Sequence, residues 1–188
     1  MITLYLSPGS SSMATHIALN EAGASFETRP LTLQKGTRTP DFLAINPNGK
    51  VPALVVDGTV ITEVAGTLFY LARAFPEADL MPAGLLGEAE AVSWMSFAAS
   101  TLHPAAGQGP ERVAEVWRIA EQKLAGKEWC VGGKYSIADI HLFRLYWRFK
   151  DRFGLKPGDH RSVQALHDRM LQRPAVRKTI EAEAKIAN

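Results

Sequence analysis

Residues 46–61 read Asn46-Pro47-Asn48-Gly49-Lys50-Val51-Pro52-Ala53-Leu54-Val55-Val56-Asp57-Gly58-Thr59-Val60-Ile61, and this passage determines how the N-terminal part of the chain folds. It holds two apolar, β-branched runs on either side of Asp57-Gly58, one of the stronger short-range signals for a β-hairpin. The preceding residues 34–49 are rich in Gly, Thr, Pro and Asn and predict a loop, with one helical turn at 40–44. A hairpin entered from a long loop is therefore expected.

The residues on both sides of this hairpin extend the pattern. Residues 2–6 are β-prone and end at the turn signal Pro8-Gly9. A helix is expected over 13–22, a short strand over 25–31, and a second helix over 62–75, where apolar residues recur at helical spacing. The order β-α-β-loop-β-β-α predicts an α/β N-terminal domain.

Beyond this domain the sequence changes character. Residues 76–84 contain two prolines and a glycine without a periodic pattern, which indicates a linker. The chain is therefore divided into a first domain over 1–76, a linker over 77–84 and an all-helical domain over 85–188. Helices are expected over 85–103, 111–125, 136–150, 163–171 and 174–184. The first of them carries a stripe at four- and three-residue steps: Leu85, Ala89, Val92, Ser96, Ala99 and His103.

One of these helices has a well-defined start. Ser136-Ile137-Ala138-Asp139 has the spacing of a capping box, in which each end residue bonds the backbone of the other. The apolar residues that follow surround the helix axis, which is typical of a buried central helix. The capping residues are therefore expected to be structural.

The composition excludes several classes of function. The 188 residues are 46% hydrophobic and 21% charged, with a net charge of +2 and no basic cluster, so a nucleic-acid-binding protein is not indicated. The only cysteine, Cys130, permits no intrachain disulfide. No apolar run approaches the roughly 18 residues needed to span a bilayer, and the N-terminal residues lack the pattern of a signal peptide. A cytoplasmic protein without membrane contact is therefore expected. Metal-ligand spacings, phosphate-binding loops and the serine-hydrolase elbow are all absent.

Five motifs in order resemble the glutathione transferase superfamily, and particularly its bacterial beta class. They are SPGSSSMATHIALNEAGASFE at 7–27, the N-P-x-G-x-V-P-x-L signature at 46–54, Thr62-Glu63-Val64, Ser136-Ile137-Ala138-Asp139, and Arg173-Pro174-Ala175-Val176. The resemblance covers nearly the whole chain. It implies a thioredoxin-like N-terminal domain followed by a glutathione-transferase-type helical domain, with glutathione as co-substrate and no metal.

By this resemblance, the backbone of Val51, before a cis Pro52, pairs with the cysteinyl part of glutathione. On the bare sequence a trans proline at a strand start is the alternative. Glu63 and Val64 begin a helix whose free N–H groups suit the γ-glutamyl carboxylate. Glu63 either meets the ligand's ammonium or only complements the helix dipole. Lys35 and Lys50 are glutathione contacts or solvated surface charges.

This chain differs from the beta class at the position that acts on the glutathione thiol. The beta class usually has a cysteine where Ser11 aligns, and this chain has Ser10, Ser11 and Ser12. Only a thiolate is a good nucleophile, so a hydroxyl aimed at the glutathione sulfur would assist by stabilising the charged form. Ser11 is the first candidate for this role, with Ser10 and Ser12 as alternatives or as turn and cap residues. The family also implies His103, on a helix of the second domain, as an aid to thiol deprotonation; the alternative is a packed structural histidine.

The expected function is therefore glutathione transfer to a small hydrophobic electrophile, by a homodimer. The alternative is a non-catalytic binding or scaffold protein that keeps the fold, since one fold hosts both kinds of protein. The missing cysteine and Val64, where many relatives have a serine, favour the alternative. Glu63 and the N-P-x-G-x-V-P run favour glutathione binding.

Overall fold

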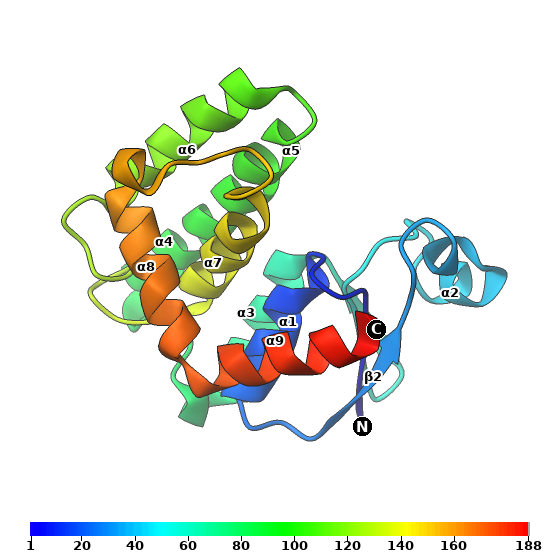
Figure 1. Ribbon diagram of the computed structural model, residues 1–188. Helices are drawn as coiled ribbons and strands as arrows, with labels where there is room; N and C mark the ends of the chain where they lie inside the picture. The colour runs from blue at the N-terminus through cyan, green and yellow to red at the C-terminus, as the bar shows by residue number, and fades with distance from the viewer. Residues whose placement is uncertain (188) are drawn as a thin grey trace. The chain divides into compact units, whose positions relative to one another are not determined.

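The computed structural model describes residues 1–187 and divides into two compact units. Unit 1 combines residues 1–78 with the last helix, α9 (Pro174–Ala187), and unit 2 comprises Asp79–Arg173. The sequence-based division followed chain order and placed residues 174–188 in the second domain. The packing differs because α9 lies against α1 (Ser12–Glu21) in unit 1, as Figure 1 shows in red and blue.

Unit 1 is built on a four-stranded mixed sheet in the order β2-β1-β3-β4. Its strands are β1 (Ile2–Leu6), β2 (Phe26–Pro30), β3 (Ala53–Val56) and β4 (Thr59–Thr62). β1 runs parallel to β2 and antiparallel to β3, and β3 and β4 form the predicted hairpin. Its turn residues Asp57 and Gly58 have φ values of 47° and 85°, the two positive values that a tight hairpin turn requires.

Unit 1 also contains the helices predicted for residues 1–76, joined by α9 from the end of the chain. They are α1, α2 (Pro40–Ile45), α3 (Val64–Ala74) and α9, with short 3-10 turns η1 (Gly36–Arg38) and η2 (Pro76–Ala78). α1 is buried along almost its whole length because it packs against β1, α3 and α9. One buried polar contact joins α1 to α3: the Thr15 and Thr67 hydroxyl oxygens are 2.7 Å apart. The start of α3 is therefore fixed against α1.

Unit 2 is all-helical, as predicted. It contains α4 (Gly84–Phe97), a π-helical turn η3 (Ala98–Leu102), α5 (His103–Ala105), α6 (Pro110–Leu124), α7 (Ile137–Phe149), a 3-10 turn η4 (Pro157–Asp159) and α8 (Arg161–Gln172). α7 is the buried central helix, and its predicted capping box is present: Ser136 and Asp139 bond each other's backbone. Figure 1 shows α7 in yellow with its neighbours α4 and α8.

The helix expected over 85–103 differs from expectation in two ways. It is interrupted by η3, in which the His103 N–H donates to the Ala98 carbonyl five residues back. Pro104 explains the widened turn, because proline has no N–H and its ring displaces the carbonyl four residues earlier. The stripe from Leu85 to His103 faces outward, and a different face is buried: Ala91, Trp94, Met95, Ala98, Leu102 and Ala105.

The N-terminus of α8 is capped from α6. The two carboxylate oxygens of Glu121 accept the Ser162 N–H at 2.9 and 3.0 Å, and one of them also accepts the Val163 N–H at 3.0 Å. Burial by itself raises the pKa of Glu121, but these backbone hydrogen bonds outweigh it and leave the pKa below its ordinary value. The ionised carboxylate therefore stabilises the folded state.

Replacing Glu121 with glutamine is expected to lower the free energy of unfolding by about 1 kcal/mol at neutral pH, since a cap charge is worth this much. The folded-state pKa lies below the unfolded value, so the contribution is complete above the ordinary value of 4.5 and is lost as the pH falls through the folded value. Urea unfolding of both proteins at neutral and acidic pH measures this. An equal difference at both pH values would contradict it.

Candidate functional site

The serine loop between β1 and α1 is held by its own hydrogen bonds. Gly9 has a φ of 66°, which allows the turn, and the Ser10 N–H donates to the Ser7 carbonyl at 3.0 Å. The Ser12 hydroxyl accepts the Ser7 N–H at 3.1 Å and donates to the Ser7 carbonyl at 3.2 Å. The Ser10 hydroxyl lies 2.8 Å from that of Ser12, and both side chains are buried. Ser10 and Ser12 thus have a structural role in the loop.

Ser11 is arranged differently. Its residue is half-buried, and its hydroxyl makes no capping bond to α1. Instead, the hydroxyl donates to the Val51 carbonyl at 2.6 Å, forty residues further along the chain. The structure thus brings together two of the predicted site residues, Ser11 and Val51.

The loop before β3 presents Val51 to this hydroxyl. The predicted cis peptide bond between Val51 and Pro52 is present. Asn46 is buried and shapes the turn: its side-chain amide donates to the Lys50 carbonyl at 2.7 Å, and its side-chain oxygen accepts the Asn48 N–H at 3.2 Å. Gly49 has a φ of 59°, and a Cβ there would lie 2.7 Å from the Thr37 carbonyl oxygen. The motif therefore has an asparagine at position 46 for its hydrogen bonds and a glycine at position 49 because a side chain would not fit there.

Tyr5 lies in β1 and packs against this loop. Its ring centroid is 5.6 Å from that of Phe42, and both pack in a cluster with Val51 and Ala53. Tyr5 therefore packs in the core between β1 and the loop before β3.

Glu63 and Val64 lie at the start of α3. Glu63 is the residue before the first turn and has a φ of 63° and a ψ of 138°, an unusual conformation for a residue with a side chain. Strained backbone of this kind clusters at ligand-binding positions. The Thr67 hydroxyl donates to the Val64 carbonyl at 3.0 Å, which adds to the contact with α1. The first-turn N–H groups give the start of this 11-residue helix a positive polarity, which favours anions in general.

The remaining predicted residues are less constrained. Lys35, just before η1, and Lys50, just before the cis proline, are both exposed. His103 belongs to unit 2, where it opens α5; its exposed ring has its centroid 6.0 Å from that of Phe149. His141 lies on α7. Its pKa is lowered to about 3, first by burial and then by the charges of Arg144 and His103. His141 is therefore neutral at physiological pH.

Sequence reasoning missed one functional candidate, Glu183 on α9. This residue is 4% exposed and contacts the serine loop, with the Gly9 N–H donating to its carboxylate at 2.7 Å. The signal was present in the sequence: an acid follows Val176 and Thr179 at helical spacing on an otherwise buried face. A charge on such a face requires partners, because burying an unpaired carboxylate is costly.

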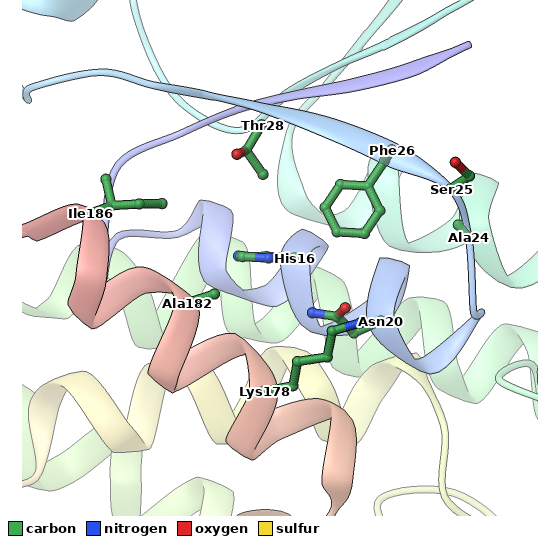
Figure 2. Close-up of a pocket in the computed structure, with 9 residues that line it drawn as sticks. All are labelled: His16, Asn20, Ala24, Ser25, Phe26, Thr28, Lys178, Ala182 and Ile186. Carbon is green, nitrogen blue, oxygen red and sulfur yellow. The ribbon is translucent and has the colours of Figure 1, made fainter.

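A cavity of about 380 Å³ lies elsewhere in unit 1 and contains none of the predicted site residues. Figure 2 shows its lining from α1, β2 and α9, including His16, Phe26 and Lys178. Among residues 1–187, no three His, Cys, Asp or Glu side chains gather in a way that could hold a metal ion. The described helices include none with both the length and the apolar character needed to cross a membrane.

A thioredoxin-like unit with a cis-proline loop, together with an all-helical unit, defines the class of this protein. The sequence matches two family descriptions, "Glutathione S-transferase, N-terminal domain" over residues 1–73 and "Glutathione S-transferase, C-terminal domain" over residues 91–174. The chain belongs to the glutathione S-transferase family.

Individual relatives agree with this assignment. Glutathione S-transferase GstA of Escherichia coli O157:H7 is 31% identical over 96% of this chain and 98% of its own. A sphingomonad glutathione S-transferase, solved in complex with glutathione, superposes with a TM-score of 0.88 at 33% identity, over 97% of this chain and 98% of that one. The beta-class enzyme of Sphingomonas chungbukensis has a TM-score of 0.85 at 33% identity, covering 96% and 98% of the two chains. The predicted likeness to bacterial beta-class proteins is confirmed.

Proposed function

We propose that this protein is a glutathione transferase that binds glutathione in unit 1, stabilises its thiolate and adds it to a small hydrophobic electrophile. The observation that carries the proposal is the contact of the Ser11 hydroxyl with the Val51 carbonyl. This contact places a half-buried hydroxyl beside the backbone that the family uses for the cysteinyl part of glutathione. The sphingomonad relative was solved with glutathione bound, which supports the same ligand here.

Glutathione needs anion donors at both ends, because it carries two carboxylates. The free N–H groups of the first turn of α3 suit the γ-glutamyl carboxylate, and the Glu63 carboxylate suits the neighbouring ammonium. Val64 supplies an N–H but no hydroxyl, which predicts weaker binding than a serine would give. Lys35 and Lys50 are exposed and are proposed for the glycyl carboxylate.

Ser11 is proposed to stabilise the thiolate, and the hydrogen-bonding of its neighbours supports this choice. The Ser10 and Ser12 hydroxyls are buried and bonded within the loop, whereas the Ser11 hydroxyl donates outside the loop, to the Val51 carbonyl. Rotation about the Cβ–Oγ bond redirects the proton from the Val51 carbonyl to a sulfur bound alongside it. Hydrogen bonding to the charged form lowers the thiol pKa, so the thiol proton passes to solvent. The electron pair of the thiolate sulfur then forms the bond to the electrophilic carbon as the leaving group departs with its bonding electrons. His103 remains proposed as an aid to thiol deprotonation.

A cytoplasmic homodimer is proposed as the working form. The outward face of α4 supports an interface, because Leu85 and Leu86 are 85% and 75% exposed in the single chain. Large exposed apolar residues in one patch are typical of interaction sites. Sedimentation equilibrium tests this: a mass of 20.5 kDa, that of one chain, would contradict it.

Conjugation of glutathione to an activated aryl chloride tests the enzymatic proposal. The absorbance of the thioether product measures turnover. We expect turnover that saturates with substrate in the wild type and is strongly reduced in Ser11→Ala. A range of alkyl halides and epoxides then identifies the preferred electrophile. Binding of glutathione without turnover of any of these compounds would contradict an enzyme and leave a binding protein.

A further inference from the structure

Glu183 is a buried carboxylate that bridges two parts of unit 1. Its Oε2 accepts the Gly9 N–H at 2.7 Å, and its Oε1 lies 3.0 Å from His16 Nδ1. A carboxylate oxygen accepts hydrogen bonds, so Nδ1 carries the proton in this contact. Glu183 and His16 are 4% and 3% exposed, so both contacts are shielded from water. A buried polar group that loses its hydrogen-bond partner there destabilises the folded state.

The two groups that Glu183 holds flank Ser11 in the sequence. Gly9 precedes Ser11 by two residues, in the turn whose φ of 66° sets the direction of the loop. His16 follows it by five residues, on the buried face of α1. Glu183 thus fixes the loop before Ser11 and the helix after it to the same side chain of α9.

The imidazole is itself held in place. Its ring meets that of Phe26 edge-on, with centroids 5.6 Å apart and planes at 84°. Figure 2 shows the His16 side chain of α1 near β2 and α9, where it lines the cavity described above. The imidazole ring that connects Glu183 to α1 is therefore held in one orientation.

We propose that Glu183 is a positioning residue, which holds the Gly9 turn so that the Ser11 hydroxyl lies at the Val51 backbone. The role in catalysis rests on the proposed function. The structural half, that Glu183 orders the loop, stands on the ligand-free contacts alone. Moving a catalytic group by about 1 Å can lower the rate about a hundredfold. A serine loop without the Glu183 contact would therefore hold the Ser11 hydroxyl less accurately and catalyse more slowly.

The chain offers a matched control one turn away on both helices. Asn20 Nδ2 donates to Thr179 Oγ1 at 2.9 Å, which also joins α1 to α9 through a partly buried contact. Thr179→Val removes this contact without touching the serine loop. Glu183→Gln is the conservative variant: its amide oxygen can accept the Gly9 N–H, and its NH₂ can donate to the other tautomer of His16.

The test compares Glu183→Ala, Glu183→Gln and Thr179→Val with the wild type in two measurements. In ligand-free protein, amide hydrogen exchange at Gly9 to Ser11 is expected to be about tenfold faster in Glu183→Ala, from the lost hydrogen bond, and unchanged in Thr179→Val. With glutathione, Glu183→Ala is expected to lower kcat about tenfold, change KM less than threefold and raise the pKa of the bound thiol. Glu183→Gln is expected to recover most of each effect.

Unchanged exchange at Gly9 to Ser11 in Glu183→Ala would overturn the proposal, as would an equal loss of kcat in Thr179→Val. If Glu183→Ala does not fold, Glu183→Asp replaces it, because a side chain shorter by one methylene cannot keep both contacts and is expected to speed the same exchange. If wild-type protein fails to bind glutathione, the proposed function fails, while the exchange measurement still decides whether Glu183 orders the loop.

Discussion

Replacing Ser11 with alanine is expected to raise the pKa of bound glutathione by about 1–2 units, each unit being about 1.4 kcal/mol. The same change is expected to lower kcat/KM by about 10–100-fold, because a hydrogen bond to the reacting charge is lost. The hydroxyl lies 2.6 Å from the Val51 carbonyl, at the backbone proposed for the cysteinyl group. Ultraviolet absorbance of the thiolate, followed against pH in the complex, measures the pKa, and steady-state kinetics measure the rate.

Ser10→Ala is the control for this change. The Ser10 hydroxyl lies against that of Ser12 inside the loop, so its loss is expected to reduce stability and leave the thiol pKa within a few tenths of a unit of wild type. A thiol that titrates identically in wild type and Ser11→Ala would remove Ser11 from the chemistry. A shift in Ser10→Ala alone would transfer the role to that residue.

Replacing Asp139 with alanine is expected to lower the free energy of unfolding by about 3–5 kcal/mol, because buried donors lose their acceptor. The carboxylate accepts the Cys130 N–H at 2.7 Å, the Ser136 N–H at 2.8 Å and the Ser136 hydroxyl at 3.0 Å. It thereby closes the capping box of α7 and fixes the segment before that helix. Chemical denaturation, with glutathione absent, measures the change.

An exposed acid in the first turn of another helix serves as the comparison. Glu111 lies in the first turn of α6, and its replacement by alanine is expected to cost no more than about 0.5 kcal/mol, the value of a solvated dipole contact. If Asp139→Ala cost as little as Glu111→Ala, the capping box would not be a main determinant of the stability of unit 2.

Local signals in the sequence were sufficient for much of the fold. Asp57-Gly58 produced the hairpin because its two positive φ values suit these residues, and Ser136 with Asp139 produced the start of α7. The cis bond before Pro52 was expected from the family resemblance carried by the passage from Asn46 to Leu54, whereas the bare sequence also allowed a trans proline. The hairpin turn and the start of α7 each depend on residues within a few positions of one another.

The features that were missed depend on contacts between distant segments. The contact of Glu183 with Gly9 joins residues 174 positions apart, so the spacing of Glu183 with Val176 and Thr179 indicates a buried acid but not its partner. The place of α9 in unit 1 likewise depends on its packing against α1. The outward stripe of α4 has the same period as its buried face, so spacing alone did not distinguish them. Ser11 was the first candidate among the three serines on the resemblance, and its role stays a prediction that the hydrogen bonds of the folded loop support.

Calorimetric titration of glutathione into the wild-type protein tests the central proposal most directly, with α-glutamyl-cysteinyl-glycine as the matched ligand. The proposed site predicts saturable binding of glutathione with a dissociation constant of about 1 mM or below, equivalent to about 4 kcal/mol or more. It also predicts much weaker binding of the α-linked isomer, whose carboxylate and ammonium are wrongly placed for Glu63 and the start of α3. No heat of binding at millimolar glutathione, or equal binding of the two peptides, would contradict the account.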